Sequence, residues 1–104
     1  MKTLIISTSD NKQILVGLRI DNKEFFKSQK VDISKAQATL PLIEKILKEK
    51  GIALLDLNSI EVNTGPGSFT GIRVGISIAN ALSFALGIPV NGKAAPDFAD
   101  PLYT

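Results

Sequence analysis

The feature that most constrains the fold is a glycine-rich run at residues 65–73, which reads GPGSFTGIR. A short apolar segment, residues 57–62, precedes it, and a long apolar segment, residues 70–86, follows it. A strand that passes through a glycine turn directly into a helix is a β-α unit, the building block of α/β domains. Glycine-rich backbone can approach another group closely, and the N–H groups that start a helix can bind an anion.

Hydrophobic spacing predicts four strands besides this unit. Three are expected ahead of the first helix and one at the end, at residues 4–6, 13–20, 24–31 and 88–90. The first three read as an antiparallel meander joined by polar turns. The predicted order is β-β-β-α-β-α-β, an α/β domain with a mixed sheet and helices over residues 1–92, followed by a tail at residues 93–104.

Two helices are predicted, at residues 35–50 and 70–86. Each is followed by a glycine, Gly51 or Gly87, which is the residue that most often ends a helix. Pro41 falls within the first helix, where it lies either in the first turn of a shorter helix or at a kink.

Small residues recur every fourth position along the second helix, at Gly71, Gly75, Ala79 and Ser83. Glycine inside a helix costs about 1 kcal/mol relative to alanine, so the two glycines imply that another backbone comes close. The other faces of this helix are also apolar, which is typical of a helix covered on more than one side. A partner protein or a second copy of the chain could supply the cover, or the helix could pack against the first helix.

Composition excludes several kinds of site. The 104 residues include no cysteine and no histidine, which removes thiolate metal sites, a cysteine nucleophile and the Ser-His-Asp arrangement. The net charge of +2 is nearly balanced and predicts no nucleic-acid patch. We expect a cytoplasmic protein without a signal peptide or membrane contact, because the longest apolar run, about 13 residues, is too short to cross a bilayer.

The glycine turn fits neither common nucleotide fingerprint. A Walker loop needs a lysine followed by Ser or Thr after its last glycine, whereas Ile72 and Arg73 follow Gly71. A dinucleotide fingerprint needs glycine where this run has Thr70. A tight turn without a ligand, with Thr70 or Ser68 as the helix N-cap, remains an alternative.

The full string resembles the TsaB (YeaZ) family of bacterial proteins. The residues that carry the resemblance are the block at 65–73, Gly75, the later run ALGIPV at 85–90, the opening LIISTS at 4–9 and the LPLI at 40–43. This resemblance covers nearly the whole chain, and it implies an actin-like (ribonuclease-H-like) lobe. It also implies that Pro41 is tolerated inside the first helix.

The resemblance further implies a role in the threonylcarbamoyl modification of tRNA adenosine. Proteins similar to TsaB are non-catalytic: they bind the catalytic subunit TsaD through their helices, also form homodimers, and work with an ATPase-type subunit, TsaE. We therefore expect tRNA to be reached only through the complex. No tightly bound cofactor is expected, and ATP or ADP at the partner interface is the one nucleotide that the resemblance allows. Relatives carry a second lobe of comparable size.

We predict two sets of site residues from this resemblance and the small-residue spacing. The partner interface is predicted at Gly71, Arg73, Gly75, Ala79, Ser83, Leu40 and Ile43. An anion or nucleotide is predicted to lie near Gly65, Gly67, Ser68 and Thr70. Arg73 would direct its charge toward the partner or a phosphate, unless it forms a surface salt bridge. No catalytic or metal-binding residue is predicted.

Two departures from the family pattern support a non-catalytic role. Ser7 stands where this fold usually ends its first strand with an aspartate, and Lys35 stands where relatives often have a histidine. Two other functions stay open: a small nucleotide hydrolase or degenerate peptidase-like enzyme, and a truncated homodimeric regulator without a tRNA role.

Overall fold

The computed structural model describes residues 1–10, 12–31 and 35–93. Three strands form the predicted antiparallel meander: β1 (Lys2–Ser7), β2 (Gln13–Ile20) and β3 (Lys23–Lys30). A fourth strand, β4 (Ser59–Val62), pairs in parallel with β1, so the sheet is mixed and has the order β3-β2-β1-β4. The tail predicted at residues 93–104 lies, from residue 94 onward, outside the described residues.

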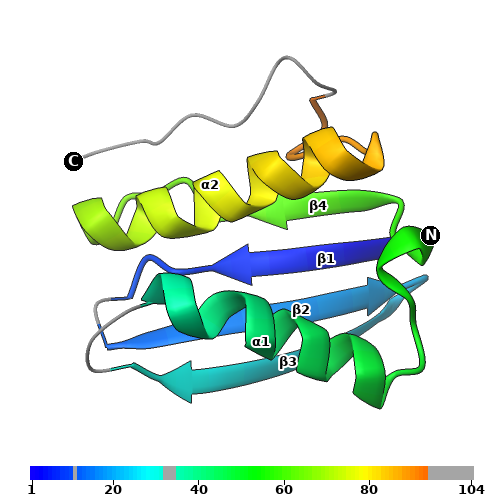
Figure 1. The fold of residues 1–104 in the computed structure, drawn as a ribbon, viewed down its shortest axis with the longest axis horizontal. Coiled ribbons are helices and arrows are strands. Elements are labelled where there is room, and N and C mark those ends of the chain that lie inside the picture. The colour runs from blue at the N-terminus through cyan, green and yellow to red at the C-terminus, as the bar shows by residue number, and fades with distance from the viewer. Residues whose placement is uncertain (11, 32–34, 94–104) are drawn as a thin grey trace.

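Both helices cover the same face of this sheet (Figure 1). The first, α1 (Lys35–Glu49), lies over β2 and β3, and the second, α2 (Phe69–Leu86), lies over β1 and β4. Pro41 is inside α1, as predicted. Gly51 and Gly87 follow the helices with positive φ angles of 65° and 67°, a conformation that glycine adopts without steric cost.

Alternation along the strands explains why the helices lie on this face. Alternate residues of β1 from Leu4 onward and of β2 from Ile14 onward are large aliphatic side chains, and these side chains point toward the helices. The core consists of the fully buried Leu4, Ile6, Ile14, Val16, Leu18, Ile43, Ile46, Ile60, Ile72 and Ala79, with neighbouring aliphatic residues. Burying one such large aliphatic side chain stabilises the fold by about 1.5–3 kcal/mol.

Two local features differ from the sequence prediction. The strand expected at residues 88–90 is a single parallel bridge between Val90 and Ile60, because the chain turns back at once through Asn91 and Gly92. A short 3₁₀ helix, η1 (Leu54–Asp56), precedes β4 and was not predicted. None of the helices in the described part of the chain is long and apolar enough to span a bilayer.

Candidate functional site

The small residues of α2 face the domain's own sheet. Ala79 and Ser83 are fully buried, and Gly71 and Gly75 are buried as well. A Cβ atom on Gly75 would lie 2.6 Å from the Thr8 hydroxyl oxygen, and one on Gly71 would collide with the Thr8 carbonyl and the Lys35 ammonium. The backbone that comes close to α2 is therefore the chain that follows β1.

This placement corrects the predicted interface. The four small residues cannot contact a partner in the folded domain, because other residues of the domain already bury them. Ile43 is also in the core, with 1% of its surface exposed. Ser83 has a structural role, since its hydroxyl donates a 2.5 Å hydrogen bond to the carbonyl of Ile88. Packing of α2 within the domain was one of the predicted alternatives, and in the structure Gly71 lies against Thr8 and Lys35, the first residue of α1, while Gly75 lies against Thr8, Val62 and Ile6.

Leu40 and Arg73, the other two predicted interface residues, are exposed beside a groove between α1 and α2. The groove has a volume of about 470 Å³. Its walls are mostly small or apolar, and they are Ala36, Leu40, Thr70, Arg73, Val74, Ser77 and Ile78. Leu40 is 44% exposed, which leaves an apolar side chain at the groove open to a partner.

The glycine turn is held by contacts within the chain. Ser68 caps α2, as predicted, by accepting a 3.3 Å hydrogen bond from the Gly71 N–H. The Ser68 N–H donates to the Ser9 carbonyl at 2.9 Å, and the Gly65 N–H donates to the Asn63 side chain at 2.9 Å. The Gly65–Pro66 peptide bond is cis. The N–H groups of Gly65 and Ser68 are thus already occupied, and anion binding at Gly65, Gly67, Ser68 and Thr70 stays a prediction.

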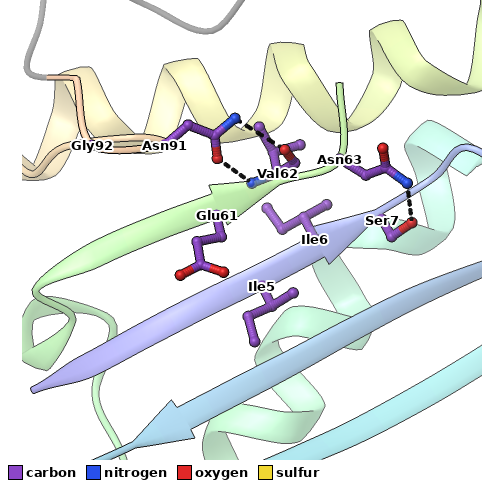
Figure 2. Close-up of a pocket in the computed structure, with 8 residues that line it drawn as sticks. All are labelled: Ile5, Ile6, Ser7, Glu61, Val62, Asn63, Asn91 and Gly92. Atoms are coloured by element: carbon purple, nitrogen blue, oxygen red, sulfur yellow. Dashed lines mark hydrogen bonds between the residues drawn. The ribbon is translucent and has the colours of Figure 1, made fainter. Parts of the chain in front are cut away.

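A second hollow, about 490 Å³, lies on the face of the sheet away from the helices (Figure 2). Ser7, at the end of β1, accepts a 3.3 Å hydrogen bond from the Asn63 side chain. The Asn91 side chain accepts from the Val62 N–H at 2.8 Å and donates to the Val62 carbonyl at 3.0 Å. These polar groups satisfy one another, and Glu61 is the one carboxylate in the lining. The described residues contain no group of three acidic side chains that could hold a metal ion.

Glu61 forms an ion pair across the sheet with Arg19. The Arg19 guanidinium makes hydrogen bonds of 2.5 and 3.1 Å to the Glu61 carboxylate and one of 2.8 Å to Glu24. The hydrogen bond from Arg19 lowers the pKa of Glu61, and both carboxylates raise the pKa of Arg19. The ion pair links β2 to β4 across β1. Its side chains are 34% and 48% exposed, so it stabilises the fold only weakly.

This ion pair predicts a small acid sensitivity. The pKa of Glu61 is below its ordinary value of 4.5, so its stabilising effect is complete above that pH and is lost as the pH falls through the folded pKa. We expect Glu61→Gln to reduce the loss of unfolding free energy between about pH 5 and 3 by less than about 1 kcal/mol. Urea unfolding across that range measures the effect. Glu44→Gln, at an exposed position on α1, is the control and should follow the wild type.

The comparisons with known proteins agree with this architecture. The family model "TsaD: tRNA N6-adenosine threonylcarbamoyltransferase" matches residues 29–92, more than half of the chain. A protein named "tRNA threonylcarbamoyladenosine biosynthesis protein TsaB", from Buchnera aphidicola subsp. Schizaphis graminum, is 51% identical over 53 residues, 51% of this chain and 25% of the relative. The chain belongs to the TsaB (YeaZ) family.

Solved structures of the TsaB (YeaZ) family confirm the predicted fold. YeaZ from Pseudomonas aeruginosa superimposes with a TM-score of 0.80 at 32% sequence identity, over 86% of this chain and 41% of that one. The fold is thus the actin-like α/β fold. A tRNA N6-adenosine threonylcarbamoyltransferase from Nitrosospira multiformis is also 49% identical over 53 residues, 51% of this chain and 15% of that protein. The chain spans about a quarter of the length of the TsaB relative and about two fifths of the YeaZ chain.

Three features of the site escaped the sequence prediction. Thr8 is buried under α2, Ala36 and Ile78 line the groove, and Asn91 closes the edge of β4. No local pattern marks Thr8 or Asn91, because each acts on a residue far away in the sequence. The groove residues had a weak signal, since apolar positions surround α2 on every side.

Proposed function

We propose that this chain is a non-catalytic partner in tRNA N6-threonylcarbamoyladenosine modification, and that it docks a TsaD-like subunit in the groove between α1 and α2. The observation that carries the proposal is the exposed apolar groove, with Leu40 on one wall and Val74 and Ile78 on the other. An amphipathic helix from a partner fits such a groove, because apolar side chains at helical spacing can fill it.

A TsaD-like occupant is supported by the matched region of the chain. Residues 29–92, which match the TsaD model, contain the whole of α1 and α2. A TsaD-like protein is therefore expected to present a related pair of helices. Identical surfaces pair about a twofold axis in symmetric dimers, and two related surfaces can pair about an approximate twofold axis in the same way. Each helix pair then fills the groove of the other. The same geometry accounts for the homodimer that we expect when the chain is alone.

A scaffolding role is also consistent with the side chains available for chemistry. The sequence contains no histidine and no cysteine, the residues that most often serve as general base or nucleophile near neutral pH. The Ser7 hydroxyl at the end of β1 is bonded to Asn63. In this proposal the chain acts in the cytoplasm, a TsaE-like ATPase joins the assembly, and tRNA is bound by the complex as a whole.

Co-purification with the TsaD-like subunit tests the proposal. We expect a complex whose mass in light scattering equals one copy of each chain, and we expect threonylcarbamoyladenosine in reconstituted tRNA to depend on adding this chain. If the chain stays a homodimer when TsaD is in excess, the proposal is wrong, and the result favours the alternative of a homodimeric regulator without a tRNA role. Magnesium-dependent ATP hydrolysis by the isolated chain would instead favour the hydrolase alternative.

A further inference from the structure

The three residues that follow β1, Thr8 to Asp10, lie between the starts of α1 and α2. The Thr8 side chain is fully buried beneath α2. Its hydroxyl donates to the Gly71 carbonyl and accepts a 3.0 Å hydrogen bond from the Gly75 N–H. In a regular helix these two backbone groups bond to each other, since the N–H of each residue donates to the carbonyl four residues earlier. The Thr8 hydroxyl thus bridges the Gly71 carbonyl and the Gly75 N–H, and so attaches α2 to the loop after β1 at these two residues.

The start of α1 is fixed to the same three residues by Lys35. The Lys35 ammonium donates hydrogen bonds to the Thr8 carbonyl, at 2.9 Å, and to the Asp10 carbonyl. Its burial lowers the pKa of Lys35, an effect that the charge of Asp10 opposes. The ammonium also occupies the space that a side chain at position 71 would fill, so it reaches the loop only because residue 71 is glycine.

Ser9 completes the connection on the side of the glycine turn. Its carbonyl accepts the Ser68 N–H, and Ser68 is the N-cap of α2. A Cβ atom on Gly67 would lie 2.7 Å from the Ser9 Cβ, so the turn and the loop are in tight contact. Backbone and side-chain bonds from three consecutive residues therefore hold the first turns of both helices.

We propose that Thr8 and Lys35 are positioning residues that set the separation of α1 and α2, and with it the width of the groove. Apart from Ile78, which is at the middle of α2, the residues that line the groove lie in the N-terminal halves of the two helices, near these contacts. Helix pairs pack at separations of about 8–10 Å, so a change of about 1 Å alters which side chains a groove can accept. The effect on partner binding rests on the proposed function, whereas the effect on helix separation does not.

Distance measurements between the helices test this role directly. The chain has no cysteine, so Glu44→Cys on α1 and Ala81→Cys on α2 supply the only sites for spin labels. Neither residue lines the groove. Thr8→Val keeps the shape of the side chain but loses both hydrogen bonds. We expect it to broaden the distribution of inter-label distances, or to shift its mean by about 1–2 Å from the wild-type value. Thr8→Ser, which keeps the hydroxyl, should preserve the wild-type distribution.

Affinity for the TsaD-like subunit is the second measurement. Thr8→Val and Lys35→Met should each weaken binding about tenfold, a loss of about 1.4 kcal/mol, at an unchanged folded fraction by circular dichroism. Lys45→Met, at an exposed lysine of α1, should bind like the wild type. Wild-type distances and affinity in both variants would overturn the proposal. If Thr8→Val does not fold, Lys35→Met decides the question, and if the wild type does not bind TsaD, the proposed function fails while the distances still test the positioning role.

Discussion

Replacing Gly75 with leucine is expected to destabilise the isolated domain by about 3 kcal/mol, because extra atoms in a packed interior usually cost about 1–3 kcal/mol and the hydrogen bonds of Thr8 are lost as well. The first added atom would already lie 2.6 Å from the Thr8 hydroxyl oxygen and 3.4 Å from a Val62 methyl group. For a domain of this size, such a loss lowers the melting temperature by roughly 12–24 °C. Thermal unfolding followed by circular dichroism measures it.

Ala81→Leu is the matched control for this substitution. Ala81 is exposed on α2, so a leucine there adds the same side chain in the same helix without a clash. Its melting temperature should stay within a few degrees of the wild type. A Gly75→Leu variant that melts with the wild type but no longer binds TsaD would show that residue 75 faces a partner and not Thr8.

The second large effect is expected at Leu40. Its side chain is 44% exposed at the edge of the groove, so Leu40→Glu should leave the domain folded and place a charge where the partner docks. Truncating an apolar hot-spot residue of an interface costs about 2 kcal/mol or more, and an unpaired buried charge costs further free energy. We expect affinity for the TsaD-like subunit to fall at least about 30-fold, measured by titration calorimetry.

Leu55→Glu provides the control for charge and composition. Leu55 is 84% exposed in η1 and does not line the groove. The same substitution there should change neither the melting temperature nor the affinity beyond experimental error. Equal loss of binding in both variants would point to η1 as part of the interface. Loss in neither would remove the groove as the docking surface.

Most of the fold could be predicted from the sequence, because local spacing determines these elements. Alternating aliphatic residues predicted the meander, and a glycine after each helix marked where it ends. The strand at residues 88–90 was predicted too long, since one parallel bridge at Val90 satisfies the edge before the chain turns at Asn91 and Gly92.

The candidate site was predictable only in part. The spacing of Gly71 and Gly75 correctly indicated that another backbone comes close to α2, but a repeat of four residues does not say which backbone. The answer depends on Thr8, more than 60 residues earlier in the chain. Because that face of α2 is buried, the surface open to a partner is the groove between α1 and α2. Leu40 and Arg73 were predicted as interface residues and line this groove, whereas its other lining residues Ala36, Val74 and Ile78 were not predicted.

The outer side of β4 has a consequence for self-association. An uncovered strand edge attracts strands from other molecules and is a common starting point for aggregation. Here Ile60 bonds to the backbone of Pro89 and Asn91, and the Asn91 amide satisfies both backbone groups of Val62. One side chain thus takes the place of a neighbouring strand residue at the end of the sheet. Copies of this domain that meet at β4 find no unpaired backbone group at Ile60 or Val62, so strand-to-strand polymerisation is blocked on that side.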